Sequence, residues 1–319
     1  MSEKNLVICD REIGYAMALA ENIAEREELH VKVYTFTSLE RAFLFSQEKK
    51  IHILLVDEDL EGYEREVMET EAQFVLIHGG HREVREKEQP IYKYQCAAHI
   101  IQEVFEYYVE ATDGNILKEY GQNRTRVEAI YSPVRGIGKS RFAIALGKEL
   151  ARNQKVLYLN LEEYPGFEVN GPCEDNLNLG DLLYFQRQNE GNLCLRLQSA
   201  VKKMGELDYV PPIYLSTDLK EVKEEEWVSF LKKVVAFGYY EKILLDMSES
   251  VQGLFSILNM CDLVLMPISD DESSLQKVSR YETCVKRLKL EKIRENTKQF
   301  VMPSDVEEFV RRNMKEEIA

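Results

Sequence analysis

The chain has 319 residues, 45% of them hydrophobic, and this length predicts two globular domains because a single core seldom supports so long a chain. No stretch approaches the roughly 20 apolar residues of a membrane-spanning helix, and the first residues do not resemble a signal peptide, so we expect a cytoplasmic protein without direct membrane insertion. The formal net charge is −15, and residues 1–124 carry 25 acidic against 14 basic residues, which disfavours nucleic acid or an anionic membrane as a partner of that half and favours a protein.

Short apolar runs alternate with longer helical stretches over the first 112 residues. Helices are expected at 15–26, at 38–47 with Thr37 as the cap, and at 97–109. Alternation of strands and helices predicts an α/β fold, a doubly wound sheet of receiver-like (flavodoxin-like) type, over residues 1–112. The strands are expected at residues 6–9, 31–34, 51–56, 74–77 and 91–92.

The same alternation begins again after residues 113–124, whose Asp, Gly, Asn and charged residues predict a linker. Residues 125–319 form the second predicted domain, also doubly wound. Its first helix is expected at 140–152, and the irregular segment 164–180 predicts a functional loop. The strands of this domain are expected at residues 127–131, 156–159, 213–215, 243–245, 263–266 and 300–301.

The segment from Ser132 to Ser140 is the most informative part of the chain. It reads Ser-Pro-Val-Arg-Gly-Ile-Gly-Lys-Ser, follows a predicted strand and opens a predicted helix. Backbone amides of such a loop bind phosphate oxygens, while Lys139 is placed to reach the β- and γ-phosphates and Ser140 to bind Mg²⁺. The pattern G-x-x-x-x-G-K-[ST] requires glycine where this chain has Pro133, so a strand-to-helix turn with a chance Gly-Lys-Ser is the other interpretation. The residues expected to bind ATP are Arg135, Gly136, Ile137, Gly138, Lys139 and Ser140.

The same loop resembles the deviant Walker A loop of the MinD/ParA superfamily of P-loop ATPases, whose usual form is K-G-G-x-G-K-[ST]. Within that superfamily, the sequences at 131–134, 179–184 and 244–254 resemble the CpaE/TadZ-like proteins of Gram-positive bacteria. Those proteins serve type IV (Tad/Flp) pilus and secretion systems and carry an atypical receiver domain in front. The resemblance implies a homodimeric, ATP-dependent localisation or assembly factor, recruited to the inner face of the membrane by protein components of such a machine.

The resemblance also assigns roles to individual residues. Lys139 matches the phosphate-binding lysine and Ser140 the Mg²⁺ ligand. Asp246, at the end of a predicted strand, matches the Walker B aspartate that supports Mg²⁺. Glu162 matches the acidic residue that orients the attacking water. Lys139, Asp246 and Glu162 are therefore the expected catalytic residues.

Four positions depart from the superfamily's pattern. The signature lysine, which reaches across an ATP-sandwiched dimer, falls on Val134, and Arg135 stands where glycine is usual. Asn160 replaces an acidic residue, and Ser250 replaces the switch glycine. Because cations stabilise the transferring phosphoryl group, loss of the signature lysine predicts slow hydrolysis with affinity retained. Whether Arg135 supplies the missing cation stays open.

Strand-end residues of the first domain resemble those of a response-regulator receiver. Asp57 stands where the phosphoacceptor would be, Asp10 ends the first strand, and Lys93 lies in the last strand. Arg11 replaces the second acid of the Mg²⁺ site, and His78 replaces the usual Ser or Thr. Phosphorylation of Asp57 therefore competes with a pseudo-receiver used for dimerisation or docking, and the departures favour the pseudo-receiver.

Three further observations bear on function. The run His78-Gly79-Gly80-His81 is interpreted as a turn, because no second pair of metal ligands lies near it in sequence. Residues 306–317 predict a helix with four glutamates, which disfavours membrane anchoring of the MinD kind. The departures in the loop leave a non-catalytic scaffold as the alternative to a nucleotide switch, and the charge balance disfavours DNA partitioning.

Overall fold

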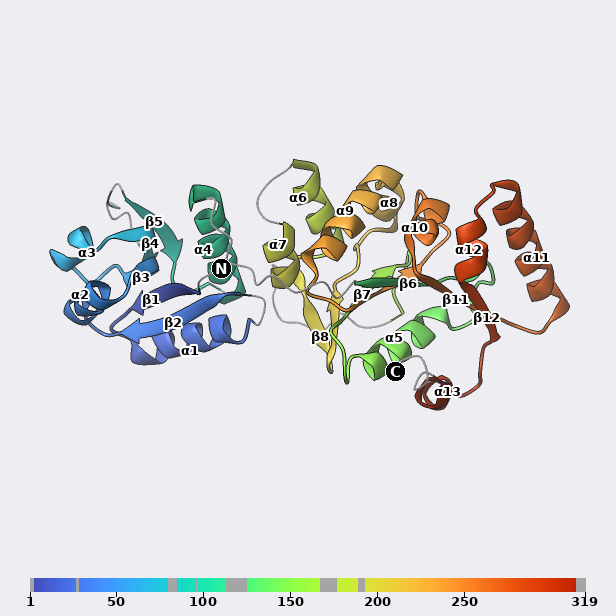
Figure 1. Ribbon diagram of the computed structural model, residues 1–319, viewed down its shortest axis with the longest axis horizontal. Helices are drawn as coiled ribbons and strands as arrows, with labels where there is room; N and C mark the ends of the chain where they lie inside the picture. The colour runs from blue at the N-terminus through green and yellow to red at the C-terminus, as the bar shows by residue number, and fades with distance from the viewer. Residues whose placement is uncertain are drawn as a thin grey trace. The chain divides into compact units, whose positions relative to one another are not determined.

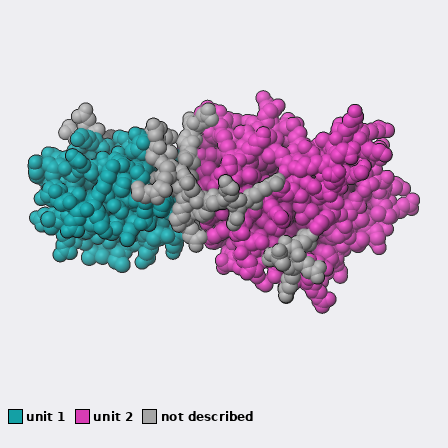
Figure 2. Space-filling view, viewed as in Figure 1, with its two compact units in different colours: residues 1–119 teal, residues 120–319 magenta. Residues whose placement is uncertain are grey.

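A computed structural model of the protein describes residues 3–26, 29–79, 85, 87–95, 97–112, 125–166, 177–188 and 193–313 (Figure 1). The chain separates into two compact units, residues 1–119 and residues 120–319 (Figure 2). Each unit is an α/β structure built on a largely parallel sheet, so the predicted fold class is confirmed. The predicted linker at 113–124 lies outside the described residues. Among the described residues, no helix combines the length and apolar character needed to cross a bilayer.

Unit 1 contains a five-stranded parallel sheet in the order β2-β1-β3-β4-β5. This is the flavodoxin-like strand order, with a switch point between β1 and β3. All five predicted strands are present: β1 Lys4–Cys9, β2 Val31–Phe36, β3 Ile51–Asp57, β4 Thr70–Ile77 and β5 Glu88–Tyr92. The helices are α1 Ile13–Ala24, α2 Leu39–Glu48, α3 Glu64–Val67 and α4 Ala97–Thr112.

Two details of unit 1 correct the sequence-based expectations. The residue that precedes α2 is Ser38, so Thr37 is not its cap. Lys93 lies one residue beyond the end of β5 and not inside the strand. Every residue of β3 is buried, because helices cover both faces of a doubly wound sheet and such strands are apolar throughout.

Unit 2 contains a seven-stranded sheet in the order β12-β11-β6-β10-β7-β9-β8, parallel except for β8 against β9. The strands are β6 Arg126–Ile130, β7 Val156–Leu161, β8 Lys202–Met204, β9 Leu207–Val210, β10 Lys242–Met247, β11 Leu263–Ile268 and β12 Thr297–Val301. The helices are α5 Lys139–Leu150, α6 Leu179–Gln188, α7 Leu193–Ala200, α8 Ser216–Glu221, α9 Glu224–Phe237, α10 Leu254–Met260, α11 Glu272–Arg287, α12 Glu291–Asn296 and α13 Val306–Asn313.

The strand predicted at 213–215 is wrong. The strand of this region is β9, which ends at Val210 immediately before Pro211 and Pro212. Proline has no backbone N–H to donate to a ladder, so the pair ends the strand. Ile213 is buried without belonging to a strand, and α8 begins at Ser216. The short hairpin of β8 and β9 was not predicted.

Helices cover both faces of the unit 2 sheet. Figure 1 shows α5 and α13 on one face and α9 on the other, and two separate hydrophobic clusters match this arrangement. Gly147 allows α5 to lie close to the sheet, because a Cβ there would stand 2.8 Å from Leu207 Cδ2. Strands β6, β10 and β7 are adjacent and parallel, so their carboxyl ends meet at one edge of the sheet. That edge carries the loop from Ser132 to Ser140.

Candidate functional site

The loop between β6 and α5 has the backbone shape of an anion-binding turn. Gly136 and Gly138 have φ angles of 71° and 88°, in the left-handed region that favours glycine. Apart from the glycine itself and its two chain neighbours, no described residue has an atom within 4 Å of the position that a Cβ would take at either glycine. Gly138 is the residue before α5, so the N-terminal amides of that helix face the same space. Such a turn and helix start together favour a bound anion.

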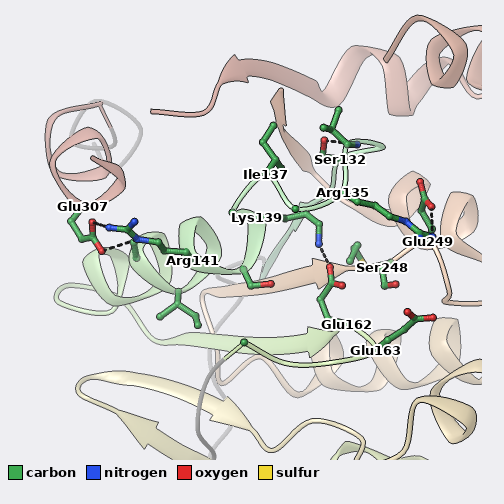
Figure 3. A pocket seen from close by; sticks show the side chains of 18 of the residues that line it. Ser132, Arg135, Ile137, Lys139, Arg141, Glu162, Glu163, Ser248, Glu249 and Glu307 are labelled. Carbon is green, nitrogen blue, oxygen red and sulfur yellow. Dashed lines mark hydrogen bonds and ion pairs between the residues drawn. The ribbon is translucent and has the colours of Figure 1, made fainter. Parts of the chain in front are cut away.

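Lys139 points from the start of α5 toward Glu162, as Figure 3 shows, and also contacts Asp246. Its Nζ donates to Glu162 Oε1 and, at 3.2 Å, to Asp246 Oδ1. Glu162 follows β7 and Asp246 lies in β10, so the fold brings the three expected catalytic residues together at the carboxyl edge of the sheet. Two acids therefore pair with this ammonium.

Asp246 is fully buried, and its second carboxylate oxygen is bound by two side chains of β7. The sequence-based predictions did not connect these two side chains with Asp246. Its Oδ2 accepts hydrogen bonds from the Tyr158 hydroxyl at 3.0 Å and from Asn160 Nδ2 at 3.2 Å. Burial, and then the nearby Asp246 charge, raise the pKa of Tyr158 well above its usual value, so the phenol stays a neutral donor. Tyr158 and Asn160 share one face of β7 because side chains two residues apart do so in a strand. The two-residue spacing in β7 therefore indicates from the sequence that Tyr158 lies beside Asn160 at the site.

The three residues that depart from the usual loop have structural roles of their own. Val134 is 7% exposed and belongs to the hydrophobic core, while its backbone amide donates to Ser132 Oγ at 3.1 Å. Pro133 lies between Ser132 and Val134 and lacks a backbone N–H. This missing donor precedes the turn that Gly136 and Gly138 form, so the turn keeps its own amides. Arg135 is exposed and pairs with Glu249 at 3.0 Å, as Figure 3 shows. The position that the resemblance assigns to the signature lysine is thus occupied by a core residue.

A cavity of about 790 Å³ lies over this loop. Its volume is within the range of roughly 300 to 1,000 Å³ typical of small-molecule sites. Its charged lining is balanced between cations and acids: Arg135, Lys139, Arg141 and Lys148 against Glu162, Glu163, Glu249 and Glu307. Because no cation is in excess, a polyphosphate in this cavity needs a counter-ion of its own.

The residues present fit Mg²⁺. The Ser140 side chain belongs to the first turn of α5 and lines the cavity beside Lys139. Asp246 supplies a carboxylate at the facing strand end. Hydroxyl, carboxylate and phosphate oxygens are the ligands that Mg²⁺ prefers, and the ion usually binds through one or two protein groups together with the phosphates.

A hydrogen bond joins the loop that follows β7 to the loop that follows β10. The Ser250 hydroxyl donates to Glu163 Oε1, and Lys220 Nζ lies 2.8 Å from the same oxygen. The resemblance assigns a glycine to the position of Ser250, whose side chain gives the two loops a bond that glycine cannot form.

Unit 1 brings together the residues expected from the receiver resemblance. Lys93 Nζ donates to Asp10, to Glu12 at 3.0 Å and to Asp57 Oδ2 at 2.5 Å. Burial alone would lower the pKa of the Lys93 ammonium, but these hydrogen bonds outweigh burial and hold the pKa above its usual value. Arg11 donates to the Asp59 carbonyl oxygen at 2.8 Å, so a cation occupies the position of the second acid.

Comparisons with known proteins give only distant likenesses. No protein-family model matches the chain, and no curated protein matches it. A ParA family ATPase from Chlorobium tepidum TLS is 18% identical over 51% of this chain and 68% of that chain, with a TM-score of 0.42. A chain of a MinC:MinD cell division protein complex from Aquifex aeolicus is 18% identical over 56% of this chain and 68% of that chain, with a TM-score of 0.40. An ATP complex of Cyanothece McdA is 16% identical over 61% and 80%, with a TM-score of 0.41. Likenesses this distant assign no function, so the site itself must support one.

Proposed function

We propose that unit 2 binds ATP together with Mg²⁺ at the loop between β6 and α5. The observation that carries this proposal is the left-handed pair Gly136 and Gly138, with open space in front of both and Lys139 at the end of the turn. Phosphate oxygens would accept from the amides of this turn and from the Lys139 ammonium. Ser140 and Asp246 would hold Mg²⁺, which supplies the positive charge that the balanced cavity lacks.

We propose that hydrolysis is slow. Arg135 is the nearest candidate for a replacement of the signature lysine, but its guanidinium pairs with Glu249, and Val134 is committed to the core. Without a cation on the transferring phosphoryl group, turnover is expected to fall by orders of magnitude while affinity is retained. Glu162 is placed to orient a water only after Lys139 leaves it for a phosphate.

The binding proposal is tested with a fluorescent ATP analogue and Mg²⁺ on the full-length protein. Binding is expected for the natural sequence and for Lys232→Ala, which removes an exposed lysine from α9. Lys139→Ala is expected to weaken binding at least tenfold, because it removes the charge that contacts the phosphates. No binding by the natural sequence, or equal binding by both variants, would remove the proposal.

A non-catalytic scaffold is the second candidate, and the burial of Val134 favours it. In that case the loop keeps its shape for packing and the protein acts only through contacts with partners. Phosphate release from ATP that disappears in Asp246→Ala would exclude this reading, provided that the variant retains the far-ultraviolet circular dichroism of the natural sequence.

We further propose that the protein works as a localisation or assembly factor, as a homodimer, on protein components of a pilus or secretion machine. The support is the resemblance of the loop and strand-end sequences described above, together with the acidic character of the first half. Unit 1 would then be a pseudo-receiver that docks protein partners. Sedimentation of the full chain with and without ATP and Mg²⁺ tests the dimer, and an unchanged monomer in both conditions would contradict it.

A further inference from the structure

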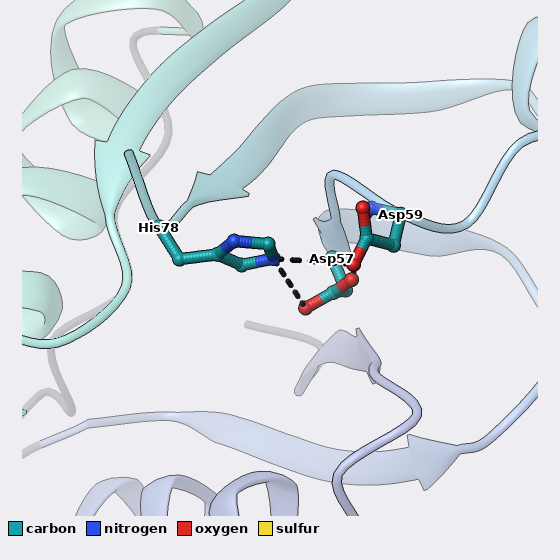
Figure 4. Close-up of side chains that lie close together, drawn as sticks. All are labelled: Asp57, Asp59 and His78. Atoms are coloured by element: carbon teal, nitrogen blue, oxygen red, sulfur yellow. Dashed lines mark hydrogen bonds and ion pairs between the residues drawn. The ribbon is translucent and has the colours of Figure 1, made fainter. Parts of the chain in front are cut away.

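Three side chains at the carboxyl edge of the unit 1 sheet lie close enough to share one ion (Figure 4). His78 Nε2 lies 3.9 Å from Asp57 Oδ2 and 3.5 Å from Asp59 Oδ2. Ligand atoms in a tetrahedral zinc site lie about 3.3 Å apart, because each bond is about 2.0 to 2.1 Å long. All three ligand atoms lie within 4.8 Å of one another, so side-chain movements would close the cluster on an ion.

The imidazole of His78 is held in a ligating orientation by a buried residue. Glu58 is 5% exposed, and its Oε1 lies 2.9 Å from His78 Nδ1 and accepts the His78 backbone amide at 2.8 Å. A carboxylate on one ring nitrogen fixes the tautomer and leaves the other nitrogen as the ligand, an arrangement that metal-binding histidines usually have. Here that other nitrogen is Nε2, which points at Asp57 and Asp59 (Figure 4).

The charge around these three residues favours a cation. Among the described residues, Lys93 contacts the carboxylates of Asp10, Glu12 and Asp57, and Arg11 contacts the Asp59 carbonyl oxygen, while Glu58 and Asp59 add two further carboxylates. Asp57 Oδ2 accepts from Lys93, but a carboxylate offers about four lone-pair positions and can bind an ion as well. Asp59 is 52% exposed and His78 28%, which gives an ion access from solvent.

We propose that His78, Asp57 and Asp59 bind a divalent transition-metal ion of the zinc class, with Glu58 orienting the imidazole. The ligand set differs from the all-oxygen set that Mg²⁺ prefers, because it includes an imidazole nitrogen, which suits zinc and its neighbours. The sequence-based interpretation of this region as a simple turn missed the site, because Asp57 and Asp59 are about 20 positions away from His78 and meet it only through the pairing of β3 with β4.

The test is calorimetric titration of the full-length, nucleotide-free protein with zinc chloride and, separately, with magnesium chloride. One zinc ion is expected to bind per chain, at least tenfold more tightly than magnesium. His78→Gln and Asp59→Asn are each expected to weaken zinc binding more than tenfold, and Glu58→Gln by about 10- to 100-fold. His30→Gln is the matched control, because His30 lies beside the first residue of β1 at the opposite edge of the sheet, and it should leave binding unchanged.

Asp59→Asn keeps the test valid if His78→Gln does not fold, because the Asp59 side chain is half-exposed. Zinc should also shift the ¹⁵N resonance of His78 Nε2 in the natural sequence. Absence of zinc binding, or equal affinity in the natural sequence and in both ligand variants, overturns the proposal and leaves His78 as a histidine paired only with carboxylates. Neither result depends on nucleotide binding by unit 2.

Discussion

The Lys139 ammonium lies 3.2 Å from Asp246 Oδ1 and also donates to Glu162, so the cation of the loop is paired with two acids. A polyphosphate at Lys139 competes with these carboxylates for the donors and the charge of the ammonium. The affinity for nucleotide then depends on how much more strongly Lys139 binds the phosphates than it binds Glu162 and Asp246.

Removing one competing carboxylate should therefore strengthen binding. In Glu162→Gln, Lys139 loses a partner that competes with a phosphate, and the cavity loses one negative charge. We expect the Kd for the ATP analogue to fall about three- to tenfold, which corresponds to about 1 kcal/mol for a partly exposed ion pair. Glu163→Gln removes the same charge from a residue that contacts Ser250 and Lys220, and it should change the Kd much less. Weaker binding by Glu162→Gln would contradict the competition.

The Tyr158 hydroxyl is expected to stabilise unit 2 through Asp246. Tyr158→Phe leaves a buried carboxylate with one donor fewer, and hydrogen bonds to charged groups contribute about 1.5 to 3 kcal/mol. Urea unfolding followed by the fluorescence of Trp227 should show a loss of that size, because this single tryptophan is buried in the unit 2 core. Tyr184→Phe, at a half-exposed position of α6, should leave the midpoint unchanged. Equal midpoints for both variants would mean that Asp246 does not need this bond.

Unit 1 should lose stability in acid through Glu71. Burial by itself would raise the pKa of the Glu71 carboxyl, but hydrogen bonds from Lys50 and Tyr108 and the charge of Lys4 outweigh it and bring the pKa to about 2. An unfolded glutamate has a pKa of about 4.3, so the ionised form favours the folded state. The contribution is complete above that value and is lost as the pH falls toward 2.

The measurement is hydrogen exchange of unit 1 amides at pH 7 and at pH 3.5. In the natural sequence, protection of β4 and α4 should fall more steeply between these values than in Glu71→Gln, which cannot ionise, after correction for the intrinsic exchange rates. An equal loss of protection in both proteins would show that other carboxyls control acid unfolding.

Beryllofluoride with Mg²⁺ is expected to leave unit 1 unperturbed. An acyl-phosphate mimic at Asp57 needs Mg²⁺ held by a second acid, but Arg11 stands there and Glu12 is bonded to Lys93 and Tyr94. Amide chemical shifts of unit 1 should therefore stay constant when the reagent is added. Shifts centred on Asp57 that vanish in Asp57→Asn would instead establish the residue as a phosphoacceptor.

Much of the architecture was predictable because local pattern determines it. The apolar runs of β1, β3, β4, β6, β7, β10 and β11 have the length and composition of buried parallel strands, and the sequence predicts all of them, together with the less buried β2, β5 and β12. The error at 213–215 came from the same rule, since an apolar triplet after Pro211 and Pro212 reads like a strand although its residues join no ladder. The hairpin of β8 and β9 was missed because both strands are short.

The sequence by itself determined the strand and helix order and the glycine turn, since neighbouring residues encode periodicity and turn geometry, while the grouping of Lys139, Ser140, Glu162 and Asp246 came from the resemblance and stays a prediction. Only the tertiary structure decided what each side chain contacts. Tyr158 meets Asp246, 88 positions away, and His78 meets Glu58, because strand register places them together. Register depends on packing across the whole sheet, and no local segment contains that information.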